Sequence, residues 1–435
     1  MNYREAVEYL NRHITHGMLP GLERISGLAD LMGNPQDGYP IIHVGGTNGK
    51  TSVSRIASML CVAHGLTTGT FTSPHLEVIQ ERLMLNGVVP SEDEFAQAVE
   101  DLAAFAEIFE ERTSKVSFFE LTAALAFSWF ADQTVEAAVI EVGLGGRWDA
   151  TNAADGDVAV ITSIGFDHMK YLGNTLEEIA TEKLQILKPE SILVTGSIPE
   201  SLDGLIEEEV NAKKATWYRY GRDFNVGGSE RAVGGWLVDI EGVHGDYPEV
   251  FLPMHGRHQT VNLATSVVAV ECLMGRSLDP AAVVEGVGVV ENPGRMEILE
   301  PDPMVLVDGA HNSEGIATLV SALEEEYRNT RWVVVLAAME DKELDVMLAP
   351  LARVAKSVVA TAVKSPRAFS VSEVAEAARE NVCGDVSEVP SPTDAVEKAK
   401  KLAGPGGGVL VTGSLYLVGT VRAYLGGRSY QPGER

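Results

Sequence analysis

The sequence has 435 residues, which is too long for one ordinary hydrophobic core, so we expect two domains. Its 62 acidic and 34 basic side chains give a net charge of −28, which would repel a polyanion and excludes nucleic acid as a partner. The scattered Cys61, Cys272 and Cys383 argue against a disulfide framework or a zinc site, and without a long apolar stretch or a signal core we expect a cytoplasmic protein with no membrane partner.

The first predicted elements lead into a glycine-rich loop. Apolar positions at spacings of three and four predict two helices within residues 1–36. Ile41, Ile42 and Val44 then indicate a buried parallel strand. The loop and the start of the next helix follow directly, with the residues Gly46, Thr47, Asn48, Gly49, Lys50, Thr51 and Ser52.

This loop has the composition of a phosphate-binding loop. Its glycines allow successive backbone N–H groups to turn toward an anion at the positive end of the helix predicted over residues 51–60. Lys50 supplies a cation for the outer phosphates, and the hydroxyl of Thr51 or Ser52 could reach a bound Mg²⁺. The common nucleotide loop has a further glycine where this chain has Val44, so this loop is one residue shorter. An ordinary glycine turn is the alternative.

The next elements are a strand and two helices. Residues 67–71 predict a short strand, and the segment Thr72 to Leu76 that ends it would, taken alone, favour a simple turn. A capping box formed by Ser91 and Glu94 opens a helix to about residue 108. Residues 118–131 form a helix that is apolar on nearly every side, so we expect it to be buried.

A single carboxylate, Glu141, ends the apolar strand predicted from residue 137. Because a buried unpaired carboxylate is costly, we expect Glu141 to hold a cation, with pairing to Arg147 as the alternative. The following strand, predicted over residues 158–164, ends in Asp167 and His168. Polar residues at the carboxyl ends of parallel strands are where open α/β sheets bind ligands.

Lys183 is predicted to point inward, because it shares one helix face with Leu176, Ile179 and Ala180. A buried ammonium group must find an anion, lose its proton or be chemically modified. The residues alone leave two readings open, a salt bridge to Glu141 or Asp167 and a functional role.

The second half of the chain begins with a change of pattern. Short alternating runs within residues 215–253, including Trp217 to Tyr220, predict a small antiparallel β appendage, and two helices follow over about 259–273 and 279–289. We place the domain boundary at the break Glu291 to Gly294, which gives domains of 1–292 and 293–435. Beyond it, alternating elements predict a smaller Rossmann-like α/β domain, with strands at 304–307, 333–336, 358–363 and 408–411 and helices at about 314–327, 342–353, 370–380, 392–403 and 415–425.

Taken together, these stretches resemble the folylpolyglutamate synthases and dihydrofolate synthases, the folate branch of the Mur ligases. The resemblance covers most of the chain and is carried by Gly46-Thr-Asn-Gly-Lys50, Thr72-Ser-Pro-His-Leu76, Phe119-Glu-Leu-Thr-Ala123, Glu141-Val-Gly-Leu-Gly-Gly-Arg147, Asp149-Ala-Thr-Asn152, Asp167-His168, Glu182-Lys183, His258-Gln259, Pro293-Gly-Arg295, Asp308-Gly-Ala-His-Asn312 and Ser414-Leu-Tyr-Leu-Val-Gly419. It implies an α/β fold with an N-terminal P-loop ATPase domain joined to the Rossmann-like domain.

The resemblance also implies a set of site residues. It places Mg²⁺ on Ser73, Glu141 and His168, and it makes Lys183 a lysine that carries a CO₂-derived carbamate and orients a second Mg²⁺. A monovalent cation is a further cofactor that it allows. The ATP contacts that it adds to the phosphate loop fall on Asn262, Arg295, Asp308 and His311.

The implied activity is an ATP-dependent amide ligase that adds L-glutamate to dihydropteroate, to reduced folate or to both, and releases ADP and phosphate. An acyl phosphate would activate the acid, with Lys50, Glu141, His168 and Lys183 as the catalytic residues. We expect a monomer. The alternatives are a Mur-type amino-acid ligase that acts on a non-folate acid and a non-catalytic module that senses ATP.

Overall fold

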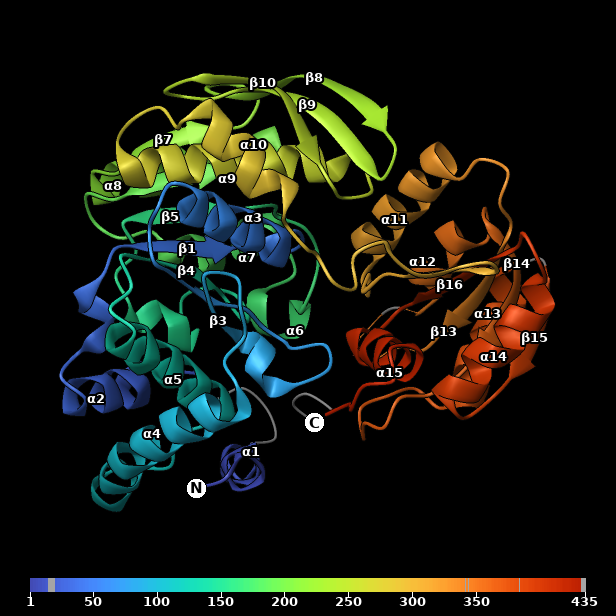
Figure 1. The fold of residues 1–435 in the computed structure, drawn as a ribbon, viewed down its shortest axis with the longest axis horizontal. Coiled ribbons are helices and arrows are strands. Elements are labelled where there is room, and N and C mark those ends of the chain that lie inside the picture. Colours follow the sequence, from blue (N-terminus) through green and yellow to red (C-terminus); the bar gives the residue numbers. More distant parts are fainter. Residues whose placement is uncertain (15–19, 341, 343, 383, 432–435) are drawn as a thin grey trace.

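Two open β-sheets organise the structure, one in each of two lobes that lie side by side (Figure 1). The computed structural model describes residues 1–14, 20–340, 342, 344–382 and 384–431. None of the described helices combines the length and the apolar character needed to cross a bilayer.

The sheet of the first lobe has seven strands in the order β3-β2-β4-β1-β5-β6-β7. All neighbours pair in parallel except β3, which is antiparallel to β2. The strands are β1 (Ile41–Gly45), β2 (Thr68–Phe71), β3 (Leu83–Leu85), β4 (Ala137–Glu141), β5 (Val158–Ile161), β6 (Ile192–Thr195) and β7 (Thr216–Arg219). Because β1, β4 and β5 are central and covered on both faces, their side chains are almost entirely apolar and buried.

Helices cover both faces of this sheet. One face packs on α1 (Tyr3–Asn11), α2 (Glu23–Leu31), α4 (Glu92–Arg112) and α5 (Phe118–Asp132), and further along it on α7 (Leu176–Lys183) and α8 (Asp203–Lys213). The other face packs on α3 (Lys50–Ala63), α9 (His258–Met274) and α10 (Pro280–Gly288). A short α6 (Met169–Leu172) follows β5. The helix predicted from residue 91 to about residue 108 extends to Arg112. The helix α7 ends at Lys183, and the chain continues as a 3₁₀ turn over Leu184–Ile186.

The antiparallel appendage is smaller than predicted. It consists of β8 (Asn225–Ala232), β9 (Gly235–Glu241) and β10 (Asp246–Leu252), which pack on α9 and α10. The prediction for Trp217 to Tyr220 was wrong, because Trp217 to Arg219 belong to β7 (Thr216–Arg219), which pairs in parallel with β6 at the edge of the main sheet. As an edge strand, β7 is less fully covered than the central strands, so more and less buried side chains alternate along it as they do in an antiparallel strand.

The second lobe is a six-stranded sheet in the order β11-β12-β16-β13-β14-β15, and only β11 is antiparallel to its neighbour. Its strands are β11 (Glu297–Pro301), β12 (Met304–Val307), β13 (Trp332–Leu336), β14 (Ala355–Ala360), β15 (Asp385–Glu388) and β16 (Gly408–Thr412). One face packs on α11 (Ser313–Glu326), α12 (Leu344–Leu351) and α13 (Val371–Asn381), and the other on α14 (Pro392–Ala403) and α15 (Leu415–Leu425). The predicted fold class is confirmed.

The second lobe contacts the first lobe near both of its ends. At the linker after α10, Asn292 Nδ2 donates a hydrogen bond to Ser52 Oγ at 2.9 Å. After α15, the segment 428–431 returns to the first lobe, where Gln431 N donates to the Glu77 carbonyl at 2.7 Å and Tyr3 donates to Gln431 Oε1 at 3.0 Å. These contacts attach the second lobe to the first lobe at two places. One is at the start of the second lobe, at the linker, and the other is at its end, after α15.

Candidate active site

A cavity of about 1190 Å³ lies between the two lobes. Its walls come from the carboxyl ends of β1, β4 and β5 in the first lobe and of β12 in the second. Every site residue predicted from the sequence lines this one cavity: Gly46, Thr47, Asn48, Gly49, Lys50, Thr51, Ser52, Ser73, Glu141, His168, Lys183, Asn262, Arg295, Asp308 and His311. The phosphate loop and the Asp308 edge therefore share one cleft.

The phosphate loop needs glycine at two positions. Gly46 has φ +142°, and a Cβ there would lie 2.0 Å from Thr162 Oγ1, while Gly49 has φ +87° and its Cβ would lie 2.8 Å from Asn262 Oδ1. Gly49 also precedes α3, and no side chain caps that helix start. The first backbone N–H groups of α3 therefore have no side-chain acceptor and can bind an anion at the positive end of the helix.

Two lysines converge on the carbonyl oxygen of Gly46. Lys50 Nζ lies 3.0 Å from this oxygen and Lys183 Nζ lies 2.9 Å from it. Burial, and then the neighbouring Lys50, lower the pKa of Lys183 to about 7, and burial also lowers the pKa of Lys50. The salt bridge to Glu141 or Asp167, one of the two alternatives that the sequence left open, does not form, and Lys183 is a buried amine that points at the phosphate loop.

Glu141 is a buried carboxylate beside the same loop, only 1% exposed. It accepts hydrogen bonds from Thr51 Oγ1 at 2.8 Å and from the Ser73 backbone N–H at 3.3 Å. Burial raises the pKa of Glu141, and Lys50 and the two hydrogen bonds oppose that effect. The alternative pairing with Arg147 is wrong, because Arg147 Nε pairs with Glu182 Oε1 at 2.9 Å.

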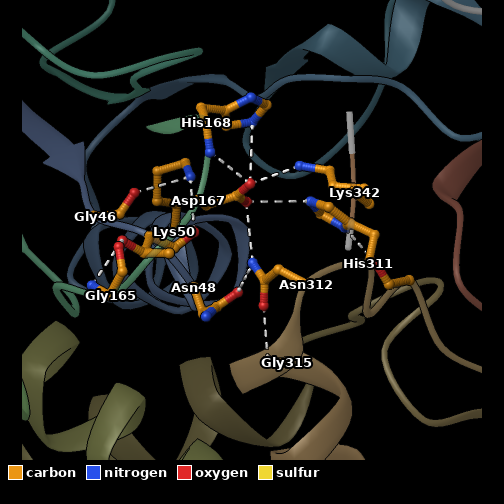
Figure 2. Close-up of polar contacts among 12 residues, drawn as sticks. Gly46, Asn48, Lys50, Gly165, Asp167, His168, His311, Asn312, Gly315 and Lys342 are labelled. Carbon is orange, nitrogen blue, oxygen red and sulfur yellow. Dashed lines mark hydrogen bonds and ion pairs between the residues drawn. The ribbon is translucent and has the colours of Figure 1, made fainter. Parts of the chain in front are cut away.

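Asp167 stands at the centre of contacts from both lobes (Figure 2). Lys342 Nζ lies 2.5 Å from its Oδ1, while Asn312 Nδ2 and His311 Nε2 lie 3.0 and 3.7 Å from its Oδ2. The backbone N–H of His168, which has the left-handed φ of +49°, donates to Oδ1 at 2.8 Å. Burial alone would raise the pKa of Asp167, but the surrounding cations hold it well below its usual range. The anion Asp167 of the first lobe thus faces three side chains of the second lobe, of which Lys342 carries the positive charge.

The second lobe presents Asp308 and His311 at the carboxyl end of β12. Asp308 accepts hydrogen bonds from the backbone N–H groups of Met296 at 2.9 Å and Ala310 at 2.8 Å. Burial raises its pKa, and Arg295 opposes that rise. His311 Nδ1 donates to the Gly309 carbonyl at 2.7 Å, which leaves Nε2 facing Asp167. Both side chains are therefore held by the backbone in fixed orientations.

The residues fit a magnesium ion that is bound together with a nucleotide. Within the described part of the chain, His, Cys, Asp and Glu side chains form no group of three that could hold a metal by themselves. Mg²⁺, however, commonly binds through one or two carboxylates together with substrate phosphates. Glu141, next to the Thr51 hydroxyl and the Ser73 amide, offers such a carboxylate at the phosphate loop.

Three residues of this site were not among the predicted site residues. Asp167 was considered as a salt-bridge partner of Lys183 and as a polar residue at a strand end, Asn312 was part of a motif, and Lys342 lay at the start of a predicted helix. Asn312 caps α11 and also donates to Asn48 Oδ1 at 3.2 Å, so it joins the second lobe to the phosphate loop. A polar residue at a strand end was the available signal for Asp167 and Asn312. Lys342 carries no such signal.

Comparisons with known proteins agree with this arrangement. Residues 44–270 match the family model of the Mur ligase middle domain, and residues 294–415 match that of the Mur ligase glutamate ligase domain. The dihydrofolate synthase/folylpolyglutamate synthase of Mycobacterium tuberculosis is 37% identical over 94% of this chain and 90% of its own length. The chain belongs to this family of Mur ligases.

Solved structures of the family extend the similarity to the whole fold. Mycobacterium tuberculosis folylpolyglutamate synthase complexed with ADP has a TM-score of 0.94 and 36% identity, covering 99% of both chains. Escherichia coli FolC in complex with DHPP and ADP has a TM-score of 0.87 and 28% identity, covering 98% of both chains. A member of this family is an ATP-dependent acid–amino-acid ligase, so the alternatives of an ATP sensor and of a non-folate ligase are not supported.

Proposed function

We propose that this protein joins the amino group of L-glutamate to the carboxyl group of dihydropteroate or of a reduced folate, at the expense of ATP. The family assignment supports an ATP-dependent ligase that acts on folate substrates. One observation carries the proposal: the phosphate loop of one lobe and the Asp308 and His311 edge of the other line a single cavity. A nucleotide and two further substrates can meet there.

The phosphate loop would hold the nucleotide with its γ-phosphoryl group near the acid substrate. Lys50 and the uncapped start of α3 supply the positive charge that phosphoryl transfer to a carboxylate requires. Bound magnesium would neutralise further phosphate charge, and Glu141, Ser73 and His168 are the residues that would hold it. Asn262, which lies on α9 beside Gly49, and Arg295, Asp308 and His311 of the second lobe would contact the rest of the nucleotide.

Lys183 would act as a carbamate. A pKa of about 7 leaves a large share of this amine neutral at physiological pH, and the neutral form is the one that adds CO₂. The carbamate would replace one of the two cations at the Gly46 carbonyl by an anion that orients a second Mg²⁺. This conversion would remove the repulsion between two ammonium groups that share one acceptor.

The acyl phosphate would then react with the amine of glutamate. We propose that residues 1–292 bind the phosphates of the nucleotide, and that residues 293–435 complete the nucleotide site and form the unit that brings glutamate to the activated acid. Closing the lobes at Asp167 would exclude water, which would otherwise hydrolyse the acyl phosphate. One chain supplies all of these residues, so we propose that the monomer is active.

The test is an assay of amide formation with labelled L-glutamate, run separately with dihydropteroate and with tetrahydrofolate. We expect a labelled product with at least one acid, and ADP release that requires acid and amine together. Reactions without ATP and reactions with D-glutamate are the controls. Failure to couple glutamate to either acid would reject the proposal.

A further inference from the structure

The helix α11 contacts the first lobe at both of its ends. At its start, Asn312 donates to Asn48 Oδ1 of the phosphate loop and to Asp167 Oδ2. At its end, which lies beside β8 (Figure 1), Glu326 binds the loop between β10 and α9. A helix of 14 residues is about 21 Å long, so the two contacts hold well-separated parts of the first lobe.

The carboxylate of Glu326 is buried and contacts the first lobe through both of its oxygen atoms. Its side chain is only 2% exposed. The backbone N–H of Gly256 donates to Oε1 at 2.5 Å, and His255 Nδ1 lies 2.6 Å from Oε2. Burial alone would raise the pKa of Glu326, but His255 and the Gly256 N–H hold it below its usual value. The contact is therefore made by a carboxylate ion, which accepts stronger hydrogen bonds than a neutral group.

The loop that Glu326 binds leads directly into α9. Gly256 has φ +90°, and a Cβ there would lie 2.4 Å from His258 Cε1, so this turn has little room to rearrange. The first turn of α9 contains no acidic residue, and its N-cap, Arg257, provides no side-chain hydrogen bond. A negative charge near the start of a helix is favourable. Glu326 thus supplies from the second lobe a charge that α9 lacks in its own first turn.

A continuous series of contacts joins this loop to the phosphate loop. The Gly256 carbonyl accepts a hydrogen bond from the Gln259 N–H at 3.0 Å, and Gln259 Oε1 accepts one from Asn262 Nδ2 at 2.9 Å. Asn262 in turn lies against Gly49, where a Cβ would be 2.8 Å from Asn262 Oδ1. Gln259 and Asn262 line the active-site cavity, whereas Glu326 and Gly256 lie outside its lining. The series therefore runs from a contact between the lobes to the phosphate loop.

We propose that Glu326 is a positioning residue for the nucleotide, which couples the docking of the second lobe to the affinity of the phosphate-loop site. In the closed lobes, Glu326 fixes the start of α9 and thereby the place of Asn262 beside Gly49. In the open lobes, α9 starts without this carboxylate and the nucleotide binds more weakly. Nucleotide binding and closure then favour each other, because a ligand stabilises the state that binds it better. The inference rests on the proposed place of Asn262 in the nucleotide site.

The test measures the binding of ADP with Mg²⁺ to the full chain by calorimetry, without acid substrate or glutamate. Glu326→Ala should weaken ADP binding about tenfold, which is within the usual range for coupled sites. Glu326→Gln keeps one acceptor for the Gly256 N–H, so its affinity should fall between those of the alanine variant and the wild type. Glu325→Gln is the matched control and should bind like the wild type, because Glu325 is 31% exposed and pairs with Arg257, which is 60% exposed.

A double-mutant cycle shows whether Glu326 acts through Asn262. Asn262→Ala should weaken ADP binding by itself, and adding Glu326→Ala to it should cause less than about a twofold further loss, because the effects of residues that act together are not additive. Three results would overturn the proposal: wild-type affinity in Glu326→Ala, or in Glu326→Gln should the alanine variant not fold; an equal loss in Glu325→Gln; and an undiminished effect of Glu326→Ala in the Asn262→Ala background. No amide forms in this assay, so a chain that binds ADP but couples no glutamate would refute the proposed function and leave this inference standing.

Discussion

The ion pair between Lys342 and Asp167 joins the two lobes at the active site, and its removal should slow the reaction by opening them. The two side chains are 8% and 10% exposed, and their charged atoms are 2.5 Å apart. In the variant Lys342→Met, we expect Asp167 to stay buried but to lose part of the positive charge that balances its carboxylate. Asn312 and His311 would still contact it from the second lobe.

The size of the effect follows from the burial of this pair. Removing one partner of a buried ion pair costs about 3 to 5 kcal/mol, because the remaining charge is left unpaired. The remaining contacts of Asp167 place Lys342→Met at the low end, about 3 kcal/mol, which corresponds to a factor of about 150 in the balance between closed and open lobes. If only the closed form reacts, kcat/KM for ADP formation should fall by about 100-fold.

The assay combines steady-state ADP formation with small-angle X-ray scattering of the same samples. Lys342→Met should be slower and more extended, and Lys342→Arg, which keeps the charge, should restore most of the rate. Arg428→Gln is the matched control at another contact between the lobes, because Arg428 is 49% exposed and its pair with Glu77 should contribute less than about 1 kcal/mol. A rate within threefold of the wild type and an unchanged radius of gyration for Lys342→Met would refute the reasoning.

Three further predictions concern the phosphate loop and its lysines. Lys50→Ala removes the cation of the loop and should lower the rate of ADP formation by about 10²- to 10³-fold, and an unchanged rate would contradict the assignment of the loop. Gly46→Ala places a Cβ 2.0 Å from Thr162 Oγ1 at φ +142°, so ATP affinity measured by calorimetry should fall at least tenfold, as roughly expected for a strained loop. Because Lys183 has a pKa of about 7, its amine becomes protonated as the pH falls below 7, and bicarbonate-dependent activity should decline over that range. Mass spectrometry should detect the carbamate in the wild type and not in Lys183→Arg, and equal activity with and without bicarbonate would count against it.

Much of the site could be predicted because parallel strands bring their carboxyl ends to one edge. Glu141 was visible as a lone carboxylate at the end of an apolar run, and it is buried beside the phosphate loop. Lys183 was predicted to point inward from helical periodicity, and it is 4% exposed. Helical periodicity could not identify the hydrogen-bond acceptor of Lys183, because this acceptor is a backbone carbonyl and every residue has one.

The contacts between the lobes could not be predicted. Lys342 and Asp167 are 175 residues apart, and nothing local distinguishes Lys342 from a surface lysine. Short edge strands were missed for a different reason: β15 carries two acidic residues in four and lacks an apolar core pattern. The strand β7 was assigned to the wrong sheet, because periodicity reports the burial of alternate side chains and does not identify the neighbouring strand.

The second lobe is anchored at both of its ends, through the linker at Asn292 and through Gln431 beside Tyr3. A domain attached at one point can rotate in any direction. A domain attached at two points rotates mainly about the axis that joins them. We therefore expect the lobes to open by rotation about the axis that joins these two attachments, once the contacts at Asp167 and those of Glu326 with His255 and Gly256 have separated. Loosening the attachment at Gln431 would make that axis less defined without touching any residue of the active site.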